Sequence, residues 1–75
     1  MQVVLYTTLG CHLCEQAREW VRTVDPSVTI NEVDVADDDV LLNRYGDMIP
    51  VLSVGGEALS WPFGLLDIQR LLQNA

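Results

Sequence analysis

The two cysteines of this chain, Cys11 and Cys14, lie in the segment "TTLGCHLCEQAREW" with two residues between them. Paired thiols at this spacing can exchange a disulfide with a substrate, bind a metal ion, or lie buried as unreactive side chains. Gly10 permits a tight turn just before Cys11, and the residues that follow have the pattern of a helix. The sequence therefore predicts Cys11 at a helix start and Cys14 one turn further along.

A thiol at a helix start is expected to be reactive. The free N–H groups of the first turn and the helix dipole favour a thiolate, which lowers the pKa below the value of about 8.5 for free cysteine. Helical residues three apart lie about 5–6 Å from each other, a separation that a disulfide accepts. We expect Cys11 to attack a substrate disulfide and the more buried Cys14 to resolve the resulting mixed disulfide.

Metal binding and inert burial are the alternatives for this pair. Cys11, His12 and Cys14 supply at most three ligands, whereas structural zinc sites use four, and the chain has no other Cys or His. We therefore expect no metal site within one copy of the chain. A dimer that shares an iron–sulfur cluster and a redox-silent adaptor both stay open. His12 can lower the pKa of Cys11 through its positive charge, or it can be a solvated side chain.

The elements that position the cysteines follow from the spacing of apolar residues. Strands are predicted at residues 2–8, 28–35, 50–54 and 57–61, because these segments are short and rich in β-branched or aromatic side chains. Helices are predicted at 10–24, 37–46 and 64–73. In the first helix, an inward stripe comprises Leu13, Ala17, Trp20, Val21 and Val24, with Glu15, Arg18, Glu19 and Arg22 facing solvent. In the last helix, the inward residues are Leu65, Ile68, Leu71 and Leu72.

The predicted order is β-α-β-α-β-β-α, which defines an α/β fold with a four-stranded mixed sheet flanked by helices. The first two strands are expected to be parallel, since a helix connects them. Gly55-Gly56 predicts an antiparallel hairpin between the last two. The alternation slips in the second strand, which predicts an edge position or a bulge. Residues 1–75 are expected to form one domain.

This order, with Cys-x-x-Cys directly after the first strand, resembles the thioredoxin superfamily. The segment "MIPV" places Pro50 at the start of the third strand, where that superfamily carries a cis-proline beside its active site. The length and the segments "GCHLC" and "WPF" resemble those of short glutaredoxin-like proteins. The resemblance implies a thioredoxin fold and a dithiol–disulfide oxidoreductase, with Cys11 and Cys14 catalytic. It also implies that the Ile49 backbone beside Pro50 pairs with an extended thiol peptide.

Several positions depart from the glutaredoxin pattern. Thr8 stands where glutaredoxins usually have Lys, and residues 60–64, "SWPFG", stand where they carry Gly-Gly-x-Asp-Asp. Those family residues hold glutathione, so we expect glutathione to be a weak co-substrate and no cofactor to be tightly bound. Phe63 and Trp61 can pack in the core or form an apolar wall near the cysteines. The residues expected to bind substrate are His12, Leu13, Ile49, Pro50 and Trp61.

Composition narrows the range of partners. Eleven acidic residues face four Arg, there is no Lys, and the net charge of −7 argues against nucleic acid or an anionic membrane. No run of 18 apolar residues and no basic, apolar leader is present, so we expect a cytoplasmic protein. We expect a monomer whose substrate is a disulfide-containing protein or a small thiol. A reductase or glutathione would recycle it.

Overall fold

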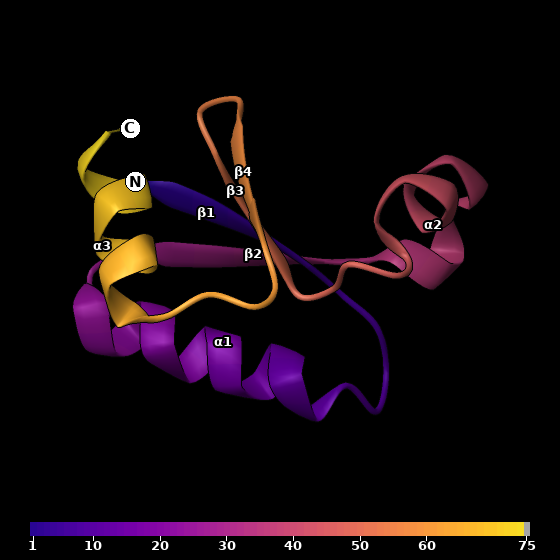
Figure 1. The fold of residues 1–75 in the computed structure, drawn as a ribbon, viewed down its shortest axis with the longest axis horizontal. Helices are drawn as coiled ribbons and strands as arrows, with labels where there is room; N and C mark the ends of the chain where they lie inside the picture. Colours follow the sequence, from indigo (N-terminus) through magenta and orange to yellow (C-terminus); the bar gives the residue numbers. More distant parts are fainter. Residues whose placement is uncertain (75) are drawn as a thin grey trace.

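Four strands and three α-helices make up the structure, a computed structural model that describes residues 1–74. Figure 1 shows their arrangement. Along the chain they are β1 (Gln2–Thr7), α1 (His12–Val24), β2 (Thr29–Asp34), the short 3-10 helix η1 (Val35–Asp37), α2 (Asp39–Tyr45), β3 (Val51–Val54), β4 (Glu57–Ser60) and α3 (Leu65–Gln73). The predicted order of elements is confirmed, and η1 is an addition to it.

The four strands form one mixed sheet in the order β2-β1-β3-β4. The first strand pairs in parallel with β2 and antiparallel with β3, and β3 pairs antiparallel with β4. The predicted α/β class with a four-stranded mixed sheet is therefore confirmed. As predicted, β2 lies at an edge of the sheet. Its residues are exposed or partly buried, which fits a strand that pairs on one side only.

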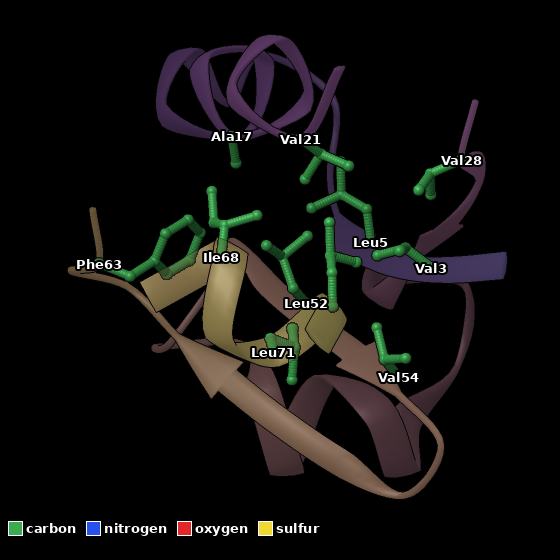
Figure 2. Close-up of a cluster of buried hydrophobic side chains, with 11 residues drawn as sticks. Val3, Leu5, Ala17, Val21, Val28, Leu52, Val54, Phe63, Ile68 and Leu71 are labelled. Carbon is green, nitrogen blue, oxygen red and sulfur yellow. The ribbon is translucent and has the colours of Figure 1, made fainter. Parts of the chain in front are cut away.

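The hydrophobic core lies between one face of the sheet and the two helices α1 and α3 (Figure 2). Successive strand residues point to opposite faces, so Val3 and Leu5 share the face that meets α1. Ala17 and Val21 project from α1 toward that face, and Ile68 from α3 completes the contact (Figure 2). The helices thus bury the stripes that their spacing predicted.

Two residues predicted to face inward are exposed instead. Leu13 is 42% exposed, because Cys14 rather than Leu13 turns inward at the first turn of α1. Leu65 is also exposed at the start of α3, where Phe63 occupies the core beside Ile68 (Figure 2). The helical periodicity was correct in both helices, but the buried stripe is narrower at the first turn than predicted.

The opposite face of the sheet is reached by α2. The Tyr6 side chain points away from the core, since it follows the inward-facing Leu5, and its ring stacks on that of Tyr45 with 4.5 Å between centroids. Asp38 caps α2 by accepting hydrogen bonds from the N–H groups of Val40 and Leu41. No residue of α2 is buried, and the helix lies beyond the end of the sheet, far from α3 (Figure 1).

One end of the sheet gathers the chain segments that surround the cysteines. The paired residues Tyr6 and Val51 place the end of β1 beside the start of β3. Thr7 lies beside Asp34 at the end of β2, and Ser60 lies beside Val51 at the end of β4. The loop of residues 8–11 leaves this same end and leads into α1. Within residues 1–74, no helix is both long and apolar enough to cross a membrane.

Candidate active site

Cys11 and Cys14 form a disulfide at the start of α1, with 5.2 Å between their Cα atoms. Cys11 occupies the N-cap position, and its sulfur accepts a hydrogen bond from the Cys14 N–H at an N···S distance of 3.2 Å. Cys11 is partly exposed, whereas Cys14 is buried. The predicted placement at the helix start is thus found. One sulfur is open to a substrate, and the other is covered.

The loop before β3 lies at the same end of the sheet as the cysteine loop. Its Ile49–Pro50 peptide bond is cis, and the Pro50 side chain is fully buried. Ile49 is partly exposed. The Pro50 carbonyl accepts a hydrogen bond from the Trp61 N–H at 3.0 Å, which ties this loop to the end of β4. The structure therefore brings Ile49, Pro50 and Trp61 to the end of the sheet where α1 begins.

The aromatic residues of the "WPF" segment pack against α1. The Trp61 ring stacks on that of Trp20 with 5.8 Å between centroids, and it meets Phe63 edge-on at 5.1 Å. Phe63 belongs to the buried core, and the partly buried Trp61 packs against it. The core-packing alternative therefore describes Phe63. A role for Trp61 in substrate binding stays a prediction.

His12 points into solvent rather than across the cysteines. Its side chain is 93% exposed, and Nδ1 lies 3.7 Å from Oε2 of Glu15. An exposed pair of this kind contributes little, because water and salt screen it. The imidazole can therefore add only a weak field at Cys11. Of the two roles predicted for His12, the geometry favours the solvated side chain.

His12→Ala is accordingly expected to change the pKa of Cys11 by less than about 0.3, since an exposed charge interacts weakly through water. The measurement is the rate of alkylation of the reduced protein as a function of pH. A rise of a full unit in His12→Ala would show that the imidazolium, and not the helix end, is the main stabiliser of the thiolate.

A pocket of about 330 Å³ opens beside Cys11, between α1 and β2. Its wall comprises residues 7–11 of the connecting loop, Glu15 and Arg18 of α1, and Glu32 and Asp34 of β2. Arg18 Nη2 lies 3.0 Å from Glu32 Oε1. The prediction that Arg18 faces solvent was wrong, because this ion pair folds its side chain against the edge strand and leaves it 32% exposed.

The spacing along α1 contained a signal for this pocket. Cys11, Glu15 and Arg18 follow one another at intervals of four and three residues, so they form one stripe on the helix surface. This stripe borders the buried stripe that contains Cys14, Ala17 and Val21. The spacing could not predict that Glu32 pairs with Arg18, because the position of Glu32 near α1 depends on the parallel pairing of β1 with β2.

Metal binding, one alternative for the cysteine pair, needs a set of donor side chains that the fold brings together. Among residues 1–74, no three His, Cys, Asp or Glu side chains come together in a way that could hold a metal ion. The exposed His12 lies near Glu15.

Comparison with known proteins agrees with this geometry. Residues 2–73 match the family model described as "Glutaredoxin-like domain (DUF836)". The X-ray structure of the Northeast Structural Genomics target protein XcR50 from X. campestris is 34% identical, with 97% of each chain covered and a TM-score of 0.84. Its solution structure gives a TM-score of 0.86 at 34% identity, covering 100% of this chain and 96% of that one.

A more distant match is a mutant of the thioredoxin-like protein BC3987. It is 25% identical, with a TM-score of 0.69, and the alignment covers 93% of this chain and 97% of that one. No curated protein matches the chain significantly.

The fold and the cysteine site define a protein of the thioredoxin superfamily with a short, glutaredoxin-like form. Within it, the chain belongs to the Glutaredoxin-like domain family (DUF836), whose model spans nearly all of its length. The fold and the closely spaced pair Cys11 and Cys14 fit a redox role.

Proposed function

We propose that this protein is a dithiol–disulfide oxidoreductase that uses Cys11 as its nucleophile and Cys14 as its resolving thiol. The observation that carries the proposal is the hydrogen bond from the Cys14 N–H to the Cys11 sulfur at the N-cap of α1. An N–H donor and a helix N-terminus both stabilise negative charge on that sulfur, and the thiolate is the reactive form.

The reaction begins with the reduced protein. The Cys11 thiolate attacks one sulfur of the substrate disulfide, a new S–S bond forms, and the other substrate sulfur leaves as a thiolate and takes up a proton. Cys14 then loses its proton and attacks the Cys11 sulfur. This second step forms the Cys11–Cys14 disulfide and releases the remaining substrate thiol. Two electrons pass from the protein dithiol to the substrate, and a thiol reductant restores the dithiol.

The unequal exposure of the two sulfurs supports these roles. A substrate disulfide can reach the partly exposed Cys11, whereas buried Cys14 is accessible only to a sulfur already attached to Cys11. The 5.2 Å separation of their Cα atoms lies within the range for a disulfide. The second step therefore needs no rearrangement of the backbone.

The surface around Cys11 favours a polypeptide or another bulky disulfide as substrate. Leu9 is 92% exposed, and Leu13 and Met48 are both 42% exposed. Exposed apolar side chains beside a reactive sulfur can be covered by an apolar partner. The Ile49 backbone, which precedes the start of β3, would pair with an extended segment of that partner. His12, which follows Cys11 in the chain, is 93% exposed and would also be open to that partner.

A direct test compares two reductants on the oxidised protein, glutathione and a thioredoxin reductase with NADPH, and measures the pKa of Cys11 in the reduced form. We expect reduction by at least one of them and a pKa clearly below that of free cysteine. A Cys11 that alkylates like free cysteine and exchanges no disulfide would favour a redox-silent adaptor. Visible absorbance from iron in protein purified without oxygen would favour a cluster carrier.

Glutathione is expected to bind weakly, because the cationic group that glutaredoxins place near the first Cys is missing. Thr8 occupies that position, beside Cys11 in the wall of the pocket, and a hydroxyl cannot neutralise a carboxylate. Thr8→Lys should therefore raise the rate of glutathione–disulfide exchange by about 1.5-fold to fivefold, the effect of roughly one exposed charge pair.

The matched control for this variant is Thr29→Lys. It adds the same charge at an exposed position where β2 begins, at the opposite end of the sheet from Cys11. An equal gain in both variants would show that net charge alone controls the rate. Saturable glutathione binding by the unmodified protein at low-millimolar concentration, with NMR shifts centred on Thr8, Ile49 and Gly64, would contradict the expected weakness.

A further inference from the structure

The pocket beside Cys11 contains a cation with an unsatisfied hydrogen-bond donor. Arg18 pairs with Glu32 through Nη2, but its Nε atom is buried and has no hydrogen-bond acceptor among residues 1–74. A buried donor without an acceptor is costly, more so when the group is charged. The oxidised protein therefore carries an unsatisfied cationic donor in the wall of the pocket that opens on Cys11.

Arg18 lies on the same side of α1 as Cys11 and lines the same pocket. The two residues are seven apart along α1, which corresponds to two turns and a rise of about 10.5 Å on the same side of the helix. Helical side chains tilt toward the helix N-terminus, and the Arg side chain is long. A side chain with this tilt can extend from its own Cα toward the helix start, where Cys11 lies. Both residues line the same pocket.

The other charges around the pocket act against a thiolate. Glu15 of α1 and Glu32 and Asp34 of β2 are carboxylates, and Arg18 is the one cationic residue that the described chain places in this wall. His12 lies near Glu15 and is exposed. Three negative charges raise the pKa of a nearby thiol, so the charge of Arg18 is the element of the pocket that offsets them.

Reduction changes the charge at one group in this pocket. In the disulfide, the Cys11 sulfur is neutral. After the dithiol forms, Cys11 can lose its proton, and the thiolate adds a negative charge to the pocket that Arg18 lines. We infer that Arg18, held against β2 by Glu32, is a positioning residue that stabilises the Cys11 thiolate and thereby favours the reduced form.

This inference rests on the proposed function, since it assigns Arg18 a part in the same reaction. The proposed function explains the Cys11 thiolate by the helix start alone. The inference adds Arg18 as a second source of stabilisation. Single substitutions at the two members of the ion pair, Arg18 and Glu32, are expected to have opposite effects on Cys11. Removing the charge of Arg18 leaves Glu32 unpaired near Cys11, whereas removing the charge of Glu32 leaves Arg18 free to act on the sulfur.

The test measures alkylation rate against pH and the equilibrium with a dithiothreitol redox buffer, in which dithiothreitol is the two-electron reductant. Arg18→Gln should lower the thiolate fraction of Cys11 at pH 6 by about threefold to tenfold, given one charge several ångströms away at an effective dielectric constant between protein and water. Glu32→Gln should raise that fraction by about threefold. The double variant should return close to the unmodified protein, and Arg18→Lys should retain most of the effect.

Arg22→Gln is the matched control, because it removes the same charge from the same helix one turn further from Cys11. The inference is overturned if Arg18→Gln leaves the thiolate fraction unchanged or if Arg22→Gln changes it equally. Should Arg18→Gln fail to fold, Glu32→Gln decides alone, since an unchanged or lowered thiolate fraction would overturn the inference.

The same data separate this inference from the proposed function. Disulfide exchange by the unmodified protein together with an unchanged pKa in Arg18→Gln would remove Arg18 from the mechanism and leave the oxidoreductase in place. Absence of exchange in the unmodified protein, with a pKa that still responds to Arg18 and Glu32, would remove the oxidoreductase and keep the electrostatic coupling.

Discussion

Cys11→Ser is expected to abolish disulfide exchange, whereas Cys14→Ser is expected to retain the first half of the reaction and stop at a mixed disulfide. The hydroxyl of serine is not ionised near neutral pH, so the variant has no nucleophile at the exposed N-cap position of α1. In Cys14→Ser, the Cys11 thiolate still attacks, but no second thiol is available to release the product.

Mass spectrometry of the two variants after incubation with a peptide disulfide provides the measurement. The Cys14→Ser protein should gain the mass of one peptide thiol, and proteolysis should place the adduct on Cys11. The Cys11→Ser protein should gain no mass, because Cys14 is buried. An adduct on Cys14 in the Cys11→Ser variant would contradict the assigned roles, since it would show that the covered sulfur is the one that reaches substrate.

Ile68→Ala is expected to remove a large share of the protein's free energy of unfolding. Ile68 is fully buried where α3 meets α1 and the sheet (Figure 2), and shortening such a side chain costs about 2–5 kcal/mol through lost burial and the remaining cavity. A chain of this length has a stability of roughly 4–11 kcal/mol. The substitution therefore removes a large share of it, because a small domain has few other contacts to compensate.

The measurement is urea unfolding followed by circular dichroism. Leu66→Ala is the matched control, since it shortens an aliphatic side chain two positions earlier in the same helix where 70% of the residue is exposed, and it should change stability by less than about 0.5 kcal/mol. Equal losses in the two variants would mean that α3 is stabilised by its own helical propensity and not by packing on α1 and the sheet.

Apolar periodicity and helix-capping preferences were sufficient to predict most of the helices and strands. The period of apolar residues predicted the helices and strands to within a few residues, and Asp38 and Gly46 delimit α2 as capping and helix-stop preferences require. The placement of Cys11 at a helix start followed from Gly10 and the change of period. These features depend on neighbours along the chain, which is why the sequence alone determined them.

The tertiary structure decided what surrounds the cysteines. The exposure of Leu13 depends on how α1 rotates against the sheet, which periodicity leaves uncertain by one residue at the first turn. Arg18 looked like a solvent-facing residue until the parallel pairing of β1 and β2 brought Glu32 beside it. Spacing along α1 determined which residues form the stripe of Cys11, Glu15 and Arg18. The partners of that stripe on a neighbouring strand depend on strand order and register. Only the assembled sheet determined which charges it meets.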